Sequence, residues 1–415
     1  MIPVARPWMG EEEAAAARRA ILSGWVTQGP EVAAFEREFA ATVGTARAEP
    51  AAPAATQRRW LRANFHAHAA AAHVEDDGTE TPAELHKAMR AAGFDFSVHS
   101  PHCNTGDADE AARYEAERGD EHKLAVRGLT IAVGQELTVA DGPHYERRTT
   151  VLGRSAPGNL DHMTLVGNEA MAPFRALTPG AACDRVHADG GLCIVNHPGP
   201  GPMMWEEGYW EAPANRGKVD ALEVYNGQAL SAVGIDFEAR YREATAYDGL
   251  GLKIAATTGA DTHGPKSLAR AQARLAGFGG ASKLLGLLAP ATHSARPELD
   301  AATLVLADGN TTPQVIAAVK ARRTIATYAM PNLQVELDGL GELRKTAKVA
   351  LAMKLSRKVA EVTLYREGVP VQTWRDVDAV AWSESLRAPA AYVFGARDGA
   401  GRMLTSAIWY EPPSR

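Results

Sequence analysis

The sequence of 415 residues predicts an α/β domain followed by a smaller all-β domain. From residue 60 to about residue 328, short apolar runs typical of strands alternate with helical stretches, which indicates either an open sheet or a barrel with helices around it. After Pro331, apolar and polar residues alternate with a period of two, and Asp-Gly and Glu-Gly pairs separate the runs. This second pattern favours a β-sandwich.

The elements of the α/β region follow from these runs. The clearest helix is predicted over TPAELHKAMRAAG, where Thr81 is the expected N-cap, Pro82 occupies the first turn and Gly93 follows the end. The predicted strands are WLRANF, FDFSV, LTIAVG, TTVLG, LCIVN, ALEVY and KIAATTG.

The residues before this region have a different composition. Residues 1–45 contain two helical segments that each end at a glycine, and residues 46–58 form a linker rich in alanine and proline that we expect to be extended. We therefore predict four parts, which are residues 1–45, 46–58, 59–329 and 330–415.

Composition narrows the classes of partner. The formal charge is −6 and no basic stripe is present, so we expect neither a nucleic-acid nor a membrane partner. The N-terminus has no signal-peptide pattern, and three irregularly spaced cysteines do not suggest a disulfide framework, so we expect reduced thiols and a cytoplasmic location. The sequence does not predict an oligomeric state.

Residues that can bind metal ions end or follow almost every predicted strand. Because the carboxyl ends of barrel strands meet at one face, such residues are expected to converge. A mixture of histidine and carboxylate without cysteine suits Zn²⁺, Mn²⁺ or Fe²⁺, and the number of groups suits two or three ions. The candidates are His66, His68, Asp77, His102, Glu136, His144, His197, Asp261 and His263.

The order of these motifs resembles that of the PHP family of metal-dependent phosphoesterases, named after polymerases and histidinol phosphatase. The matching motifs are HAH, DDG, SPHCN, GQE, NHP and DTH. The resemblance implies a distorted (β/α)7 barrel and implies that all nine candidates are metal ligands. The motifs VNHPG and EVYNG, with the β domain behind them, are similar to the carbaryl-hydrolase-like branch. The SPHCN motif departs from the family pattern because Pro101 replaces an aspartate.

Residues 1–45 resemble the start of DegT-type sugar aminotransferases that use pyridoxal phosphate. No cofactor-binding domain follows, and no Schiff-base lysine can be placed, so we do not expect a transaminase.

The resemblance implies hydrolysis of small phosphomonoesters or phosphodiesters, such as nucleotides or sugar phosphates, by a water that two or three ions activate. Glu136 would bridge two ions, and His197 or His263 would lie near the leaving group. Glu223 could contact substrate, line the cavity or cap a helix, and Tyr225 and Asn226 could contact substrate or pack in the core. Lys266, Arg270 and Arg274 could hold phosphate oxygens or lie on a solvent-exposed face.

Two alternatives remain open from the sequence. The same site could hydrolyse a carboxylic ester, carbamate or amide, or the protein could be a non-catalytic metal-binding accessory protein. The remaining histidines are assigned no role, and we expect His99 to face a helix and the others to lie at the surface. These others are His73, His86, His122, His162, His187 and His293.

Overall fold

The chain divides into two compact units, residues 1–57 and residues 58–415. The computed structural model describes 58–70, 78–103, 108–121, 126–138, 149–151, 154–156, 162–167, 178–198, 212, 214–234, 236–265 and 295–413, together with Gly10, Ala15 and Arg18. The two helical segments predicted within residues 1–45 fall almost wholly outside this part of the chain. In the described part, no helix is both long enough and apolar enough to cross a membrane.

Parallel strands dominate the first half of the second unit. β1 pairs with β2 and β2 with β4, while β8 pairs with β9 and β9 with β10, all in parallel. β7 lies between β4 and β8 and runs antiparallel to both. The strands are β1 (Arg59–Asn64), β2 (Phe96–His99), β3 (His102–Cys103), β4 (Thr130–Thr138), β7 (His162–Val166), β8 (Leu192–Val195), β9 (Ala221–Asn226) and β10 (Ala255–Gly259).

The residues that follow β1 and β10 also meet. Ala67 and Thr262 form a parallel bridge, the His68 amide donates to the Thr262 carbonyl, and the Asp261 amide donates to the His66 carbonyl. The carboxyl ends of the parallel strands therefore lie along one edge. Because β7 is antiparallel, its amino end reaches that same edge.

Helices connect and cover these strands. The predicted helix after Gly78 is α3, which begins at Thr81 with a capping box and has proline in its first turn. The others are α4 (Ala108–Glu121), α5 (Pro179–Ala188), α7 (Gly227–Val233), α8 (Glu238–Thr245), η2 (Pro297–Asp300) and α11 (Thr312–Lys320), with α3 at Pro82–Ala91.

The C-terminal strands continue the same sheet. β11 pairs antiparallel with β1 and with β12, and β12 pairs antiparallel with β18. The described strands form one sheet of 17 strands and a separate pair, β5 with β6. The remaining strands are β5 (Thr149–Val151), β6 (Arg154–Ala156), β11 (Ala301–Ala307), β12 (Thr324–Tyr328), β13 (Val335–Leu337), β14 (Leu343–Lys345), β15 (Lys348–Arg366), β16 (Val369–Ser385), β17 (Ala390–Asp398), β18 (Gly401–Thr405) and β19 (Ile408–Glu411).

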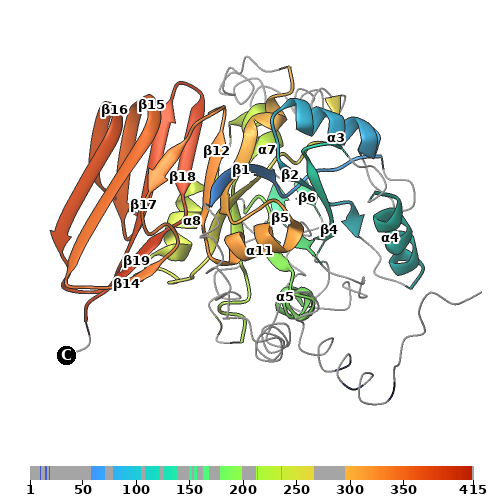
Figure 1. The fold of residues 1–415 in the computed structure, drawn as a ribbon, viewed down its shortest axis with the longest axis horizontal. Helices are drawn as coiled ribbons and strands as arrows, with labels where there is room; N and C mark the ends of the chain where they lie inside the picture. Colours follow the sequence, from blue (N-terminus) through green and yellow to red (C-terminus); the bar gives the residue numbers. More distant parts are fainter. Residues whose placement is uncertain are drawn as a thin grey trace, which may run out of the picture. The chain divides into compact units, whose positions relative to one another are not determined.

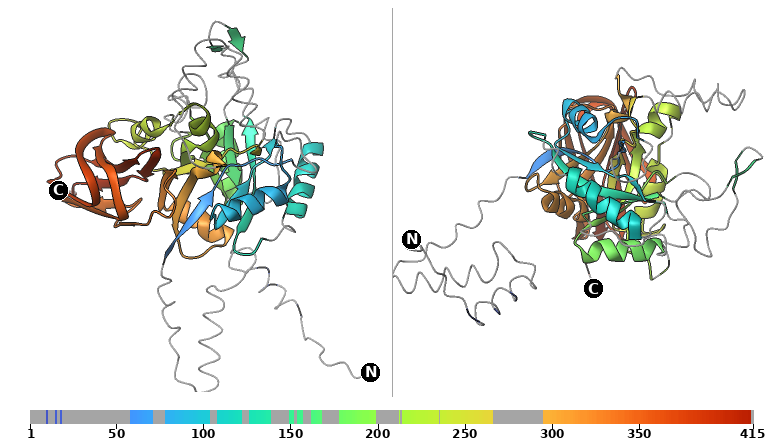
Figure 2. Two further views of the ribbon diagram at one scale, coloured as in Figure 1. Left: turned by 90° about the horizontal axis from the view of Figure 1, so that it is seen from above. Right: turned by 90° about the vertical axis from the view of Figure 1, so that its right-hand side faces the viewer.

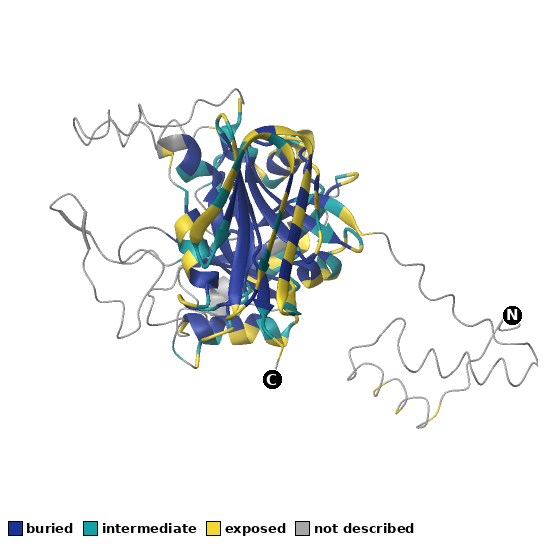
Figure 3. Ribbon diagram, turned by 90° about the vertical axis from the view of Figure 1, so that its left-hand side faces the viewer, coloured by how far each residue is buried: buried dark blue, intermediate teal, exposed yellow. Residues whose placement is uncertain are grey.

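Within the second unit, the long C-terminal strands and the helices α3 and α4 lie at opposite ends (Figures 1 and 2). Residues 331–413 contain strands and no helix, as their period of two predicts. The alternation is visible along β15, where exposed and buried residues follow one another (Figure 3). The predicted mixed α/β class is confirmed, while the (β/α)7 barrel, the sandwich and the domain bounds stay predictions.

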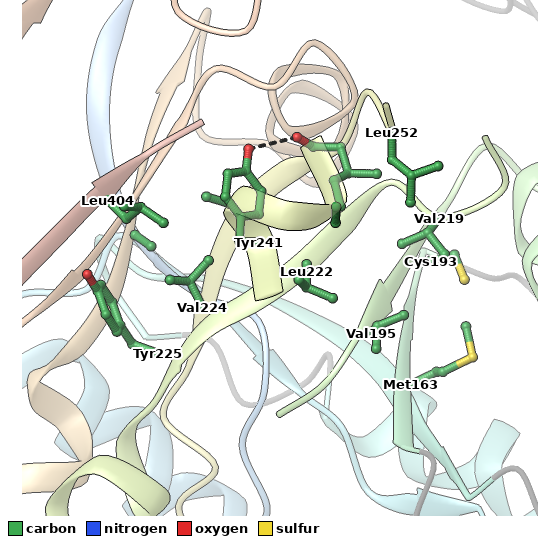
Figure 4. Packing of buried hydrophobic residues seen from close by; sticks show 14 of the residues in the cluster. Met163, Cys193, Val195, Val219, Leu222, Val224, Tyr225, Tyr241, Leu252 and Leu404 are labelled. Atoms are coloured by element: carbon green, nitrogen blue, oxygen red, sulfur yellow. Dashed lines mark hydrogen bonds between the residues drawn. The ribbon is translucent and has the colours of Figure 1, made fainter. Parts of the chain in front are cut away.

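A shared apolar core joins the parallel strands to the C-terminal ones. Leu222 of β9, Tyr241 of α8 and Leu404 of β18 belong to one buried cluster (Figure 4). The Tyr241 hydroxyl, whose pKa burial raises, donates to the Ile254 carbonyl and accepts from the Ala407 amide.

One expectation about the cysteines is wrong. Cys183 of α5 and Cys193 of β8 form a disulfide, although we expected reduced thiols. α5 and β8 are consecutive elements that pack together, and this packing brings the two Cα atoms to 5.2 Å, which is within the usual range for a disulfide. The spacing of ten residues in the sequence gave no indication of this approach.

Candidate metal centre

Glu136 of β4 is the centre of the cluster of polar residues at the strand ends. Its side chain is 1% exposed, and both of its oxygens face imidazole nitrogens. Oε1 lies 3.0 Å from His66 Nε2, 2.9 Å from His162 Nδ1 and 3.5 Å from His197 Nε2. Oε2 lies 3.1 Å from both His68 Nε2 and His102 Nδ1. Five histidines therefore surround one buried carboxylate.

Oε2 of Glu136 has no hydrogen-bond donor among the described residues, despite these close nitrogens. A buried carboxylate oxygen without a donor is costly, so it indicates a partner of another kind. The Nε2 atoms of His66 and His68 also lie only 3.1 Å apart. Two nitrogens that bind one tetrahedral ion with bonds of about 2.1 Å lie about 3.4 Å apart, so the spacing of these donors fits a shared cation.

The donor atoms form four overlapping sets of three, each compact enough for one metal ion. The sets share His66, His68, His102 and Glu136, which fits ions that lie next to one another. They are His68, His102 and His263; His66, His68 and Glu136; His66, His197 and Asp261; and His102, Glu136 and His162.

Two of these residues have backbone conformations that L-residues rarely adopt. His197 has a φ of 24° and Asp261 has a φ of 47°. Such residues cost on the order of 1–3 kcal/mol and persist only where surrounding contacts hold them. The His197 amide donates to Glu223 Oε2 at 2.5 Å, and the Asp261 amide donates to the His66 carbonyl at 2.8 Å. The His197 side chain faces Glu136, and the Asp261 side chain faces His66 and His68.

Glu223 and Asn226 of β9 orient three of the donors. His66 Nδ1 lies 3.1 Å from Glu223 Oε1, and a neutral ring that donates through Nδ1 would turn the lone pair of Nε2 toward the cluster. The Asn226 amide donates to Glu223 Oε2 at 3.2 Å and to Asp261 Oδ2 at 2.9 Å. His66, His197 and Asp261 form one of the four metal sets, and all three touch this pair.

Gly259 makes the approach of Glu223 possible. A Cβ atom at this position would lie 1.9 Å from Glu223 Oε1 and 2.5 Å from His66 Cβ. Only glycine leaves room for the carboxylate between β9 and β10.

Charges within the cluster oppose the effect of burial. Burial raises the pKa of Glu136, but the facing imidazoles of His162 and His66 outweigh it and hold that pKa well below its usual range. Burial also raises the pKa of Asp261, yet the imidazoles of His66, His263 and His197 lower it to about 2. Both carboxylates are therefore ionised at neutral pH and available to a cation.

The histidines respond in different directions. Burial lowers the pKa of His66, but Glu136, Asp261 and Glu223 together raise it well above its usual range. The pKa of His197 is also raised, since its carboxylate neighbours outweigh burial. For His162, burial is the stronger effect and the pKa is lowered.

The structure brings together seven of the nine predicted ligands, and their role as ligands stays a prediction. Asp77 and His144 lie outside the described residues, as do Lys266, Arg270 and Arg274. The seven are His66, His68, His102, Glu136, His197, Asp261 and His263.

Sequence reasoning placed His162 wrongly. We expected this histidine at the surface, but it begins β7 with a side chain that is 14% exposed and faces Glu136. We expected ligands at the carboxyl ends of strands. An antiparallel strand instead brings its first residue to the edge where the carboxyl ends of the parallel strands lie. His86 is also buried, on the inner face of α3, contrary to the prediction of a surface position.

Asn196 is a second residue that the sequence did not single out. Its amide donates to Glu136 Oε1 at 2.9 Å, and its own buried Oδ1 has no partner in the described part of the chain. In the motif NHP only the histidine was predicted to have a role. The asparagine of that motif, Asn196, donates a hydrogen bond to the Glu136 carboxylate.

Tyr225 lies away from the cluster. Its hydroxyl donates to Glu238 Oε1 at 2.7 Å, and its ring lies in the apolar core beside Val224 (Figure 4). The pairing of β9 with β10 shifts register after Glu223, so Glu223 and Tyr225 do not share surroundings despite their spacing of two. This placement does not favour the substrate contact predicted for Tyr225.

Comparison with known proteins gives one family match. Residues 7–56 match the model of the DegT/DnrJ/EryC1/StrS aminotransferase family. This stretch belongs to the first unit, and it is too small a share of the chain to assign the whole protein to that family.

Solved structures that resemble the chain include two that are only weakly similar to it. One is a two-domain protein containing a predicted PHP-like metal-dependent phosphoesterase from Bacteroides vulgatus, with 14% identity, a TM-score of 0.43, and coverage of 88% of this chain and 98% of that one. The other is an amidohydrolase from Chromobacterium violaceum with bound sulfate and no metal, with 16% identity, a TM-score of 0.30, and coverage of 49% of this chain and 88% of that one. Similarity at these values does not establish a family for this chain.

Proposed function

We propose that this protein is a hydrolase of small phosphoesters that depends on two or three divalent ions, Mn²⁺, Fe²⁺ or Zn²⁺. The observation that carries the proposal is the buried carboxylate of Glu136, whose two oxygens face different histidines. A carboxylate in this position is suited to bridging two neighbouring cations. The motif order of the sequence, which resembles that of PHP phosphoesterases, favours a phosphoester as the bond that is cleaved.

The roles of the residues follow from where they lie. His66, His68, His102, His162, His197, Asp261 and His263 would hold the ions around Glu136. Divalent ions bound there would supply Lewis acidity and lower the pKa of a water molecule toward neutrality.

His197 or His263 would lie near the leaving group, and whichever of the two does not bind an ion would be the proton donor. Their side chains are 17% and 13% exposed, similar to those of His102 and His162, whereas His66 and His68 are fully buried. An imidazole that reaches solvent and is not bound to an ion can deliver a proton to a leaving oxygen.

The finer architecture belongs to the same proposal. Parallel pairings run from β1 to β4 and from β8 to β10, β7 joins them, and the bridge between Ala67 and Thr262 connects the first and last of these strands. This closed order of pairings supports a distorted (β/α)7 barrel. The antiparallel strands β13–β19 support a sandwich-like C-terminal domain.

A test of three substrates separates phosphoester from carbonyl hydrolysis. The protein, loaded in turn with Mn²⁺, Fe²⁺ and Zn²⁺, would be assayed on nitrophenyl phosphate, bis-nitrophenyl phosphate and nitrophenyl acetate. We expect turnover of one or both phosphoesters, and we expect Glu136→Gln to abolish it. Tyr225→Phe is the matched control, because it removes a buried hydroxyl from β9 that bonds to Glu238 and not to the cluster.

Each other outcome has a defined meaning. Turnover of the acetate alone would contradict the phosphoesterase proposal. It would favour hydrolysis of a carboxylic ester, carbamate or amide by the same residues. Stoichiometric metal binding without turnover of any substrate would favour a metal-binding accessory protein. Turnover that is unchanged in Glu136→Gln would show that the catalytic site lies elsewhere.

A further inference from the structure

Arg296 lies next to the metal cluster, at the turn that leads into η2, and contacts two other segments as well as η2 itself. Its guanidinium donates from Nη1 and Nη2 to the two oxygens of Glu80, at 3.2 and 2.8 Å. Its Nε donates to Glu298, and Nη2 also donates to Thr262 Oγ1 at 3.0 Å. The Arg296 side chain is 21% exposed, whereas Glu80 and Glu298 are buried. One arginine thus compensates two buried carboxylates.

The three segments that Arg296 joins are the ones that carry or flank metal-binding residues. Thr262 lies between Asp261 and His263, and its backbone carbonyl accepts from the His68 amide at 2.8 Å. Glu80 follows Gly78 and Thr79, and the Thr79 amide and hydroxyl both donate to the His263 carbonyl, at 2.7 and 2.8 Å.

The chain after His68 is tied to the same place. The Ala70 amide donates to the Glu80 carbonyl at 2.6 Å, and a Cβ on Gly78 would lie 2.2 Å from the Ala69 carbonyl carbon. The segment 78–80 therefore lies between residues 69–70 on one side and 262–264 on the other. Its only charged side chain, Glu80, is held by Arg296.

η2 extends these contacts to the other side of the cluster. Glu298 Oε1 accepts from Thr262 Oγ1 at 3.3 Å as well as from Arg296. The backbone carbonyl of Glu298 packs so closely on Gly227 that a Cβ there would lie 2.1 Å away. Gly227 directly follows Asn226, the amide of which binds Asp261.

We propose that Arg296 is a positioning residue that holds the segments carrying His68, Asp261 and His263 in the geometry that binds metal. The proposal rests on the metal centre of the proposed function but not on the bond that is cleaved. Among the described residues, Arg296 donates hydrogen bonds to Thr262, Glu80 and Glu298, and it acts on the donors through these contacts. Its planar group directs these bonds along fixed directions, which the single ammonium of lysine does not reproduce.

Binding of Mn²⁺ alone tests this role without an enzymatic assay. Arg296→Lys retains the charge but loses the forked geometry. Thr262→Val removes the hydroxyl that Arg296 contacts, together with the hydrogen bonds of that hydroxyl to Glu298 and to the Gly264 amide. We expect each variant to bind Mn²⁺ about 10-fold to 100-fold more weakly than the unsubstituted protein, in calorimetric titrations of metal-free protein. We expect the double variant to lose less than the sum of the two free energies, because both substitutions break the same contact.

Arg344→Lys is the matched control. Arg344 also pairs with two carboxylates, Asp338 and Glu342, and its side chain is 27% exposed, but it belongs to β14 in the C-terminal strands. We expect its Mn²⁺ affinity to stay within about twofold of the unsubstituted protein, well below the loss that a partner of a ligand causes. Melting temperatures of the metal-free variants show whether each one is folded.

Four results would overturn the proposal. The first is an Arg296→Lys variant that is folded and binds Mn²⁺ normally, and the second is an equal loss of Mn²⁺ affinity in Arg344→Lys. The third is absence of Mn²⁺ binding by the unsubstituted protein. The fourth is an unfolded Arg296→Lys variant together with normal Mn²⁺ binding by Thr262→Val. If the unsubstituted protein binds Mn²⁺ but hydrolyses nothing, the proposed function fails while the role of Arg296 is still decided by the affinities.

Discussion

His162 and Glu136 lie on antiparallel strands, and the Nδ1 atom of His162 is 2.9 Å from the Glu136 carboxylate. His162, His102 and Glu136 form one of the four metal sets, so loss of the imidazole removes one of three donors. We expect His162→Ala to bind at least one metal ion fewer per chain, or to bind it at least 10-fold more weakly. Elemental analysis after dialysis and a calorimetric titration would measure both quantities.

His144→Ala provides the comparison for that prediction, since the motif order predicts His144 as a ligand. Loss of metal in His144→Ala as well would add His144 to the set without changing the expectation for His162. Full metal content in His162→Ala would contradict it.

Glu223 should affect metal binding without binding metal itself. Glu223→Gln keeps the size of the side chain but weakens its hold on His66 Nδ1 and on the His197 amide. We expect metal affinity about 10-fold to 100-fold lower, because partners that orient ligands have effects of this size. The ion held by His66, His197 and Asp261 should be lost first.

Tyr225→Phe on the same strand is the control for Glu223→Gln. It removes the hydrogen bond to Glu238 and should lower the free energy of unfolding by about 1 kcal/mol, with metal affinity unchanged. Denaturant unfolding and metal titration of both variants would check the contrast. Equal metal affinity in Glu223→Gln and Tyr225→Phe would show that Glu223 does not orient the metal ligands.

Metal binding should release protons at neutral pH. The pKa of His66 is raised well above its usual range in the metal-free protein, mainly because Glu136, Asp261 and Glu223 outweigh burial, so this imidazole carries a proton there. A metal ion needs the neutral nitrogen, so the proton must leave. Calorimetry in buffers with different ionisation enthalpies should give a release of at least about one proton, because the pKa of His197 is raised as well, and affinity should fall as the pH falls. Binding enthalpies that do not depend on the buffer would contradict this.

Lys253 should make stability depend on pH in the alkaline range. Burial lowers the pKa of Lys253 from 10.5 to about 8, although Glu411 and Glu367 oppose the shift, and its Nζ atom has no hydrogen-bond partner in the described residues. Between these two values the unfolded chain holds a proton that the folded chain has released, so stability contributed by Lys253 rises with pH there. Below pH 8 both states are protonated and the folded state bears the cost of burial.

Lys253→Met removes this titration and keeps the length of the side chain. We expect its melting temperature to exceed that of the unsubstituted protein at neutral pH, and the difference to shrink by about pH 10. The contacts of Nζ with the rings of Tyr247 and Trp409, at 3.8 and 4.7 Å, favour the charged form and limit the gain. A lower melting temperature for Lys253→Met at neutral pH would show that these ring contacts outweigh burial.

Local sequence patterns predicted the features that depend on one strand end. His66, His68, Asp261 and His263 were found because polar residues directly follow apolar runs, and parallel strands place such residues at one edge. The cap at Thr81 was equally local, since Thr, Pro and Glu within four residues specify a helix start.

The features that were missed depend on how distant segments pair. His162 reaches the cluster only because β7 is antiparallel to its neighbours. The local sequence DHMTLVG, residues 161–167, does not indicate the direction in which a strand pairs. The register shift between β9 and β10 separates Tyr225 from Glu223, although a period of two places them on one face. Arg296 has no motif around it, and its contacts with Glu80 and Thr262 appear only once the strands are assembled.

The pairing of β12 with β18 has a consequence for dissecting this protein. A chain cut near residue 330 would leave Ile325 to Tyr328 without β18, one of the two strands that pair with them, and would expose core side chains that now pack on Leu404 and Trp409. An unpaired apolar edge is a template for aggregation. The C-terminal strands therefore cover an edge that residues 58–328 would otherwise expose, and these residues alone should be recovered as insoluble material unless residues 390–411 are supplied in trans.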